Sequence, residues 1–177
     1  HTAVESTLPL TELMTRFNNY LMKTLPGESF VTANMMIFDP ASRELESINA
    51  GHPPAMLVSP DGNCRKLSIG LHPPLGFIAT EYASETVKLA DNELLCLYTD
   101  GLTESVNDEG RMLQIEGVMN MFIGVYNERG DEKAYALHDT LTMLLDEYEG
   151  NAPRADDRTF LLLKTNELST NTGQYDI

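Results

Sequence analysis

Residues 94–104 read Leu-Leu-Cys-Leu-Tyr-Thr-Asp-Gly-Leu-Thr-Glu, an apolar run that ends in a carboxylate and a glycine. The part from Leu94 to Tyr98 is apolar at every position, which is typical of a strand buried on both faces. Asp100 follows at the end of this strand, where a rigid sheet can hold a functional side chain in place. Gly101 would let the backbone pass close to whatever Asp100 binds. The alternative is that Asp-Gly forms only a turn after the strand.

A second apolar run, Phe160–Lys164, follows two adjacent carboxylates, Asp156 and Asp157. If the two strands are antiparallel neighbours, the end of the first lies beside the start of the second, and Asp100 joins the pair. Three carboxylates at one place repel each other unless a divalent cation lies between them. Oxygen ligands with room for water suit Mg²⁺ or Mn²⁺ better than zinc. The spacing therefore indicates a metal site at one edge of a sheet.

The remaining elements are read from the periodicity of apolar residues. One face of an amphipathic helix carries Leu10, Leu13, Met14, Phe17 and Leu21, with no polar group on the stripe that would suggest a cofactor site. We expect helices at about residues 8–23, 115–126 and 132–149, and further strands at 30–38, 44–49, 55–58 and 85–89. No repeat or linker interrupts the pattern. It predicts one domain over residues 1–164 and a polar, disordered tail over 165–177.

Composition excludes several classes of partner. The formal net charge of −15 opposes binding to nucleic acid or to anionic lipid. The same charge would suit a site that gathers cations, or it serves only to keep the protein in solution. No apolar run reaches the roughly 18 residues of a membrane span and no signal peptide opens the chain, so we expect a cytoplasmic location. Cys64 and Cys96 lack a metal-binding spacing and are expected to be buried free thiols.

A stiff break in the β-rich region holds the histidine that is most open to a functional interpretation. Residues 49–54 read Asn-Ala-Gly-His-Pro-Pro, and the two prolines fix the backbone next to His52. His52 is either a ligand or acid-base group, or a histidine at a strand end that bonds to backbone. The sequence leaves both interpretations open.

Five short motifs together resemble one protein family. They are Phe30–Ala33, Asn49–Pro54, Pro74–Gly76, Thr99–Glu104 and Asp156–Thr159. In this order and at these separations they resemble the SpoIIE/RsbU-type branch of the PPM metal-dependent serine/threonine protein phosphatases. The resemblance extends over roughly residues 8–164, and chance hardly explains all five motifs at once.

The resemblance implies an α+β fold of two stacked antiparallel β-sheets flanked by helices, with metal bound between the sheets at one end. It implies that Asp100 and Asp156 are ligands in a site for two Mn²⁺ or Mg²⁺ ions, and that Asp157 is a further ligand or a neighbour of the ligands. No other catalytic side chain is expected. The residues implied as support around the ligands are Thr99, Gly101, His52 and Thr159.

The implied reaction is hydrolysis of phosphoserine or phosphothreonine on a regulatory protein by a metal-bound water. In this branch the substrate is commonly an anti-sigma-factor antagonist of bacterial signal transduction, and a sensor or receiver domain precedes the phosphatase in the same polypeptide. An alternative is a non-catalytic, phosphatase-like module that binds and sequesters a regulatory protein. An unrelated β-rich ligand-binding domain is a third possibility.

The sequence departs from the family pattern at its beginning. An early acidic motif with Gly-Asp and a later Asp-Val-Ser-Gly-His-Gly motif, which supply a bridging metal ligand in the family, do not occur here. We therefore expect this chain to be a C-terminal portion that alone binds metal weakly and is a poor phosphatase. Sheet edges left exposed by the absent strands would favour self-association, for example as a homodimer.

Overall fold

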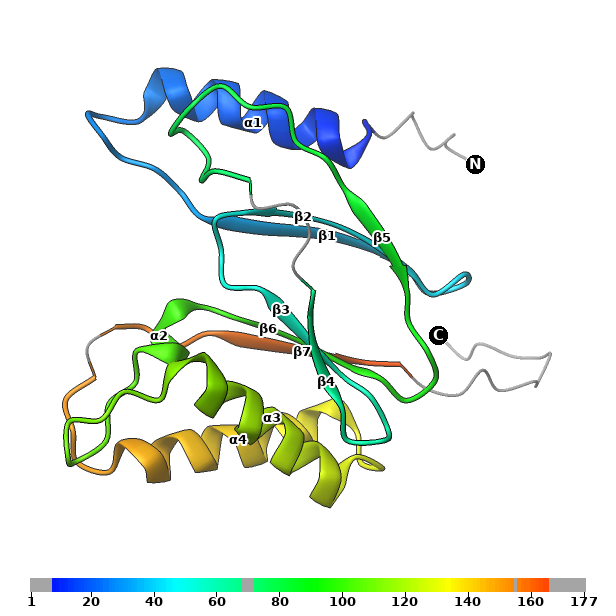
Figure 1. Ribbon diagram of the computed structural model, residues 1–177, viewed down its shortest axis with the longest axis vertical. Coiled ribbons are helices and arrows are strands. Elements are labelled where there is room, and N and C mark those ends of the chain that lie inside the picture. Colours follow the sequence, from blue (N-terminus) through cyan, green and yellow to red (C-terminus); the bar gives the residue numbers. More distant parts are fainter. Residues whose placement is uncertain (1–7, 68–71, 155, 166–177) are drawn as a thin grey trace, which may run out of the picture.

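The protein forms four layers in the order helix, sheet, sheet and helix pair (Figure 1). The computed structural model describes residues 8–67, 72–154 and 156–165. The helices are α1 (Leu10–Thr24), α2 (Asp100–Thr103), α3 (Gln114–Arg129) and α4 (Ala134–Glu149). The strands are β1 (Ala33–Asp39), β2 (Glu44–Ala50), β3 (Ala55–Val58), β4 (Cys64–Leu67), β5 (Glu85–Lys88), β6 (Leu94–Tyr98) and β7 (Phe160–Lys164).

The pairings between neighbouring strands are antiparallel in both sheets. One has the strand order β1-β2-β5 and the other β4-β3-β6-β7. Helix α1 covers the first sheet, while α3 and α4 cover the outer face of the second (Figure 1). The expected α+β fold of stacked antiparallel sheets flanked by helices is confirmed.

Strand β6 contributes to two hydrophobic cores, which explains its unbroken apolar sequence. Leu95 packs with Leu45 and Leu57 in the core between the sheets. Cys96 and Tyr98 pack in the core beneath α3 and α4. A third core lies between α1 and the first sheet. Because successive side chains of a strand point to opposite faces, only a strand between two layers needs apolar residues at every position.

Several elements differ from the sequence-based expectations. Strand β4 was not predicted, because its residues Cys-Arg-Lys-Leu lack an apolar alternation. Among the described strands it pairs with β3 alone, at the edge of its sheet. Helix α3 continues beyond the expected end to Arg129. Both cysteines are free, as expected, with Cys96 buried and Cys64 partly buried. None of the helices in the described part of the chain is long and apolar enough to cross a membrane.

Thr165 corrects the expected start of the tail. It is buried, and its hydroxyl donates to the carbonyl oxygen of Ala90 at 2.7 Å and accepts the Glu93 amide at 2.9 Å. These bonds hold the end of β7 to the turn before β6. The other tail residues, 166–177, lie outside the described part of the chain.

Helix α1 also carries a buried polar residue that the sequence reading missed. Asn18 lies on the buried stripe of the helix with Leu10 and Met14. Its side chain accepts the Gly76 amide at 2.7 Å and donates to the Ile78 carbonyl oxygen at 2.9 Å. Asn18 therefore joins α1 to the loop that precedes β5.

We expect Asn18→Ala to lower the free energy of unfolding by about 1–3 kcal/mol, because it leaves the Gly76 amide and the Ile78 carbonyl without their partner. Urea unfolding followed by circular dichroism measures the change. The exposed Asn120 on α3 is the matched control; Asn120→Ala should change stability by less than about 0.5 kcal/mol. Equal effects of the two variants would contradict the assignment.

Candidate metal centre at the ends of strands β6 and β7

Hydrogen bonds join the end of β6 to the start of β7. Strands β6 and β7 are antiparallel neighbours, which is the condition that the predicted metal site requires, and their pairing runs as far as Tyr98 opposite Phe160. Beyond it, the Thr99 amide donates to the Thr159 carbonyl oxygen at 2.9 Å. The Thr159 amide in turn donates to Thr99 Oγ1 at 3.1 Å. Two residues expected only to support the site thus align the segments that carry the aspartates.

Asp100 and Gly101 begin the one-turn helix α2 rather than a plain turn. Gly101 is buried, and a Cβ atom at this position would lie 2.3 Å from the carbonyl oxygen of Asp157. Because that oxygen belongs to the backbone, it cannot rotate away as a flexible side chain would. Only glycine allows this approach, which brings the backbone next to Asp100 against Asp157.

The three aspartates expected as ligands are all exposed. Asp156 Oδ1 accepts the amide of Asp157 at 2.7 Å. A surface pocket of about 610 Å³ opens beside them, lined by Arg154, Asp156, Asp157, Arg158 and Thr159. Within the described ranges, no three His, Cys, Asp or Glu side chains form a group that could hold a metal ion. The structure thus brings the two strand ends together without gathering a complete ligand set.

His52 lies at the same end of the sandwich as Asp100, because β3 and β6 are antiparallel with Met56 opposite Cys96. Its backbone amide and carbonyl both bond to the side chain of Asn49, each at 2.8 Å. Its ring Nδ1 lies 3.1 Å from Thr32 Oγ1. These contacts fix the loop after β2 and favour the structural interpretation of His52.

Two arginines anchor the loop with the paired aspartates to helix α4, and sequence reasoning missed this contact set. Arg154 Nε donates to Glu149 Oε2 at 2.9 Å, and Arg154 Nη2 donates to Asp146 Oδ1 at 2.7 Å. Arg158 Nη2 donates to the same Asp146 oxygen at 2.6 Å. Arg158 Nη1 lies 3.2 Å from Glu149 Oε1, an ion pair without the alignment of a hydrogen bond.

The contacts between the two arginines and the carboxylates of α4 shift the pKa values of the groups involved. The hydrogen bond from Arg158 is the largest effect on Asp146 and holds the pKa of this carboxyl below its ordinary value. The hydrogen bond to Glu149 raises the pKa of Arg154. Glu149 has a side chain only 7% exposed, whereas Asp146 lies at the surface. The buried member of the network is therefore Glu149.

The sequence does contain a signal that Glu149 is buried. Leu137, Leu141 and Leu145 form the buried stripe of α4, and Glu149 continues it at the same spacing. A charged residue on such a stripe needs a buried partner, since an unpaired charge is costly to bury. The pattern indicates that a partner exists but does not say which residue it is.

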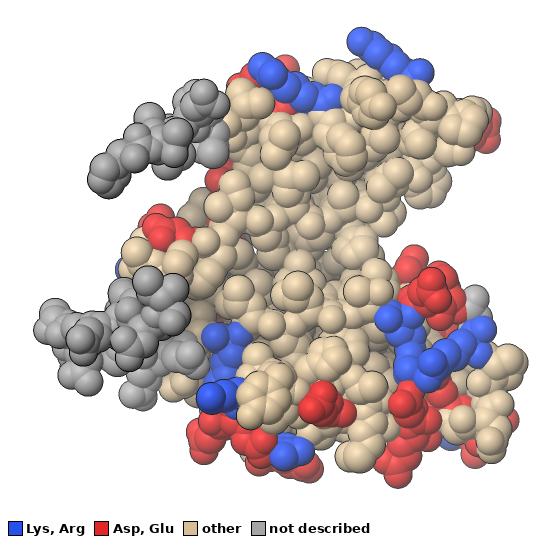
Figure 2. Space-filling view, turned by 180° about the vertical axis from the view of Figure 1, so that it is seen from behind, with Lys and Arg blue, Asp and Glu red and all other residues tan. Residues whose placement is uncertain are grey.

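One side of the molecule has a hollow in its surface. The space-filling view shows a deep notch between the α1 layer and the helical layer of α3 and α4, on the side where α2 lies in Figure 1 (Figure 2). Acidic and basic side chains gather on the lower layer beside the notch, while the walls of the notch are largely uncharged (Figure 2).

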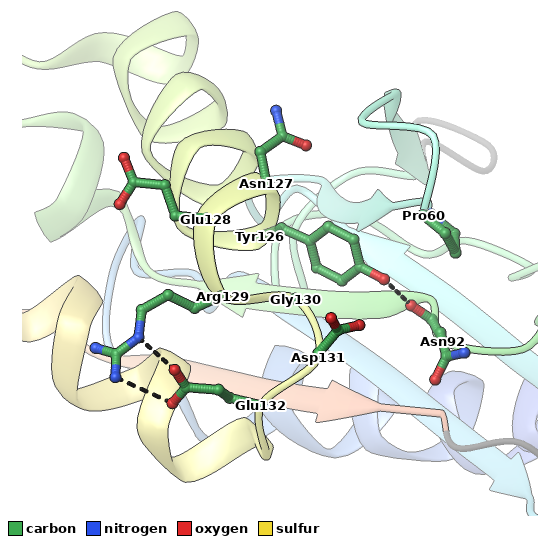
Figure 3. Close-up of a pocket in the computed structure, with 9 residues that line it drawn as sticks. All are labelled: Pro60, Asn92, Tyr126, Asn127, Glu128, Arg129, Gly130, Asp131 and Glu132. Carbon is green, nitrogen blue, oxygen red and sulfur yellow. Dashed lines mark hydrogen bonds and ion pairs between the residues drawn. The ribbon is translucent and has the colours of Figure 1, made fainter.

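A second pocket, of about 450 Å³, lies at the opposite end of β6, around Asn92 (Figure 3). Its wall includes Arg129, which pairs with Glu132 at 2.8 Å, and Tyr126, whose hydroxyl donates to the Asn92 carbonyl oxygen. Burial raises the pKa of Tyr126, so the phenol stays neutral and remains a donor. The drawn bonds connect wall residues to each other, which suits a structural role (Figure 3).

Comparisons with known proteins agree with this geometry. A family model described as Stage II sporulation protein E (SpoIIE) matches residues 1–166. The phosphoserine phosphatase RsbP of Bacillus subtilis (strain 168) is 34% identical over 76 residues, which is 42% of this chain and 19% of RsbP. The chain therefore spans about a fifth of this curated relative.

Two solved structures show the same fold. The structure of the RsbU and RsbW domains of Rv1364c from Mycobacterium tuberculosis is 26% identical with a TM-score of 0.71, over 89% of this chain and 42% of that one. The Mn-presoaked phosphatase domain of SpoIIE from Bacillus subtilis is 15% identical with a TM-score of 0.61, over 94% of this chain and 70% of that one. Since the family model covers nearly the whole sequence, the chain belongs to the SpoIIE family, with a phosphatase domain of the SpoIIE/RsbU-type PPM branch.

Proposed function

We propose that this domain, in the full-length protein, hydrolyses phosphoserine or phosphothreonine on a regulatory protein of the anti-sigma-factor antagonist type. A preceding sensor or receiver domain would control it in bacterial signal transduction. The observation that carries the proposal is the joining of β6 to β7, which sets the backbone of Gly101 against Asp157. This contact holds the segment that begins with Asp100 against the segment that carries the paired aspartates.

The donor set fits a hard divalent cation. Asp100, Asp156 and Asp157 offer only oxygen atoms, and all three are accessible from solvent. Mg²⁺ and Mn²⁺ accept few protein carboxylates and complete their coordination with water and phosphate oxygens. When bound, such ions lower the pKa of a coordinated water and offset charge on the phosphoryl group. In the proposal the aspartates supply part of the ligand set for two ions in the full-length protein, and Thr99 and Thr159 keep the two strand ends aligned.

The relatives support the proposal on chemistry and on partners. RsbP is named a phosphoserine phosphatase, and the SpoIIE crystal was presoaked with manganese. The Mycobacterium tuberculosis structure combines an RsbU domain with an RsbW domain, which associates the fold with regulatory proteins in that case. The activity, the metal and the partner are those of the relatives. We propose that this chain shares them.

Removal of divalent metal tests the proposed function. The full-length protein is treated with a chelator, dialysed, and assayed on a phosphoserine peptide with and without Mn²⁺. We expect release of phosphate to fall to background without metal and to return with added Mn²⁺, because in the proposal the metal ions activate the water that attacks phosphorus. Turnover that persists without metal would overturn the proposal. Tight binding of a phosphoprotein with no turnover at any Mn²⁺ concentration would show the non-catalytic module instead.

A further inference from the structure

A buried carboxylate on α4 connects the two halves of the proposed metal site. The Ser105 hydroxyl, which follows α2, lies 2.9 Å from Gly101 O and 2.9 Å from Glu149 Oε1. The Ser105 carbonyl accepts the Leu113 amide at 2.8 Å, so this hydroxyl sits on a fixed backbone. Glu149 is thus coupled to the helix turn that begins with Asp100.

The other side of Glu149 holds the loop with the paired aspartates. Arg154 precedes Asp156 and Asp157 in the sequence, and Arg158 follows them. Both arginines contact Glu149, one through each carboxylate oxygen. The loop is therefore held at both ends by two carboxylates of α4, the exposed Asp146 and the buried Glu149.

The backbone next to Glu149 is fixed as well. Helix α4 ends at Gly150, whose φ of +57° suits glycine. A Cβ atom at Gly150 would lie 2.3 Å from Asp108 Oδ2, and Asp108 Oδ1 accepts the Asn151 amide at 2.9 Å. These contacts keep the end of α4, and with it Glu149, from shifting toward solvent.

We propose that Glu149 is a positioning residue that fixes α2, which begins with Asp100, relative to the loop that carries Asp156 and Asp157, for metal binding. This inference rests on the proposed function. Glu149 does not touch metal or substrate; it acts through Ser105 on α2 and through Arg154 and Arg158 on the loop. Partners behind metal ligands fix ligand orientation, and their loss commonly weakens metal affinity by about 10- to 100-fold.

The test compares Glu149→Gln with Glu147→Gln in the full-length protein. Glu147 is an exposed residue of the same helix, so its substitution makes the same chemical change outside the network. Mn²⁺ affinity is measured by isothermal titration calorimetry. Hydrogen-deuterium exchange of residues 153–159 is measured on the metal-free protein. Phosphate release is measured across a range of Mn²⁺ concentrations.

For Glu149→Gln we expect about 10- to 100-fold weaker Mn²⁺ binding, faster exchange in residues 153–159, and turnover that recovers at high Mn²⁺. Glu147→Gln should match the wild type in all three. Recovery at high Mn²⁺ separates positioning from general damage, because a misfolded protein would not regain its rate. Ser105→Ala, which removes only the link to α2, should weaken Mn²⁺ binding about two- to tenfold and serves if Glu149→Gln does not fold.

Wild-type Mn²⁺ affinity in both Glu149→Gln and Ser105→Ala would overturn the positioning role, even if the loop exchanged faster. A wild-type protein that binds no Mn²⁺ would overturn the proposed metal function instead. The two failures are distinguishable, because the first appears as a comparison between variants and the second in the wild type alone.

Discussion

Replacing Asp100 with asparagine in the full-length protein is expected to lower Mn²⁺-dependent turnover of a phosphoserine peptide by about 100-fold or more. The change keeps the size of the side chain and removes its charge. Metal ions contribute several kcal/mol to stabilising phosphoryl transfer, and about 1.4 kcal/mol corresponds to a tenfold change in rate. Asp100 is exposed and begins α2, so the substitution should leave the fold intact.

Asp131→Asn is the matched control for Asp100→Asn. Asp131 is an exposed aspartate in the pocket at the opposite end of β6 (Figure 3). Its variant should keep wild-type turnover and Mn²⁺ affinity. Unchanged activity of Asp100→Asn would show that Asp100 is not a metal ligand. Loss of activity in Asp131→Asn would indicate that the second pocket takes part in the reaction.

The second large effect is expected from Gly101→Ala. One added methyl group would lie 2.3 Å from Asp157 O, so α2 and the lead-in to β7 have to move apart. Such overpacking typically costs about 1–3 kcal/mol of stability. The same displacement would separate Asp100 from the paired aspartates, and we expect Mn²⁺ affinity to fall by at least about tenfold. Urea unfolding and calorimetric titration measure the two effects.

Gly124→Ala shows what the same substitution does without a clash. Gly124 lies in the middle of α3, and a Cβ atom there meets nothing within 4 Å. Because alanine favours the helix over glycine by about 0.8–1 kcal/mol, this variant should be more stable than the wild type with unchanged Mn²⁺ affinity. A Gly101→Ala protein as stable and as tight in metal binding as the wild type would contradict the role assigned to Gly101.

Periodicity predicted most of the fold because it reflects burial directly. The apolar run of β6 and the stripe of α4 correspond to a strand between two cores and a helix on one of them. Strand β4 escaped prediction because two of its side chains are exposed and charged, and its place in the sheet comes from pairing with β3. An edge strand of this kind owes its structure to its neighbour more than to its own sequence.

The candidate site was predictable in part. The sequence indicated Asp100, Asp156 and Asp157, because a carboxylate beside an apolar run is a local signal. The antiparallel pairing of their strands was only a condition of that prediction, and the structure shows it. It did not identify Glu149, whose role comes from partners on α2 and on the loop before β7. Those contacts depend on how helix α4 packs, which no local pattern encodes.

The sequence by itself determined the family resemblance, the layered α+β fold and the residues that carry negative charge at the ends of β6 and β7. Only the tertiary structure decided why position 101 is glycine, what binds Asn18 and how Glu149 reaches the site. The physical reason is that burial leaves a periodic trace along the chain, whereas a close contact between distant segments leaves none. Asp100 is placed by its own strand, but its distance from Asp157 is set by the absence of a methyl group at Gly101.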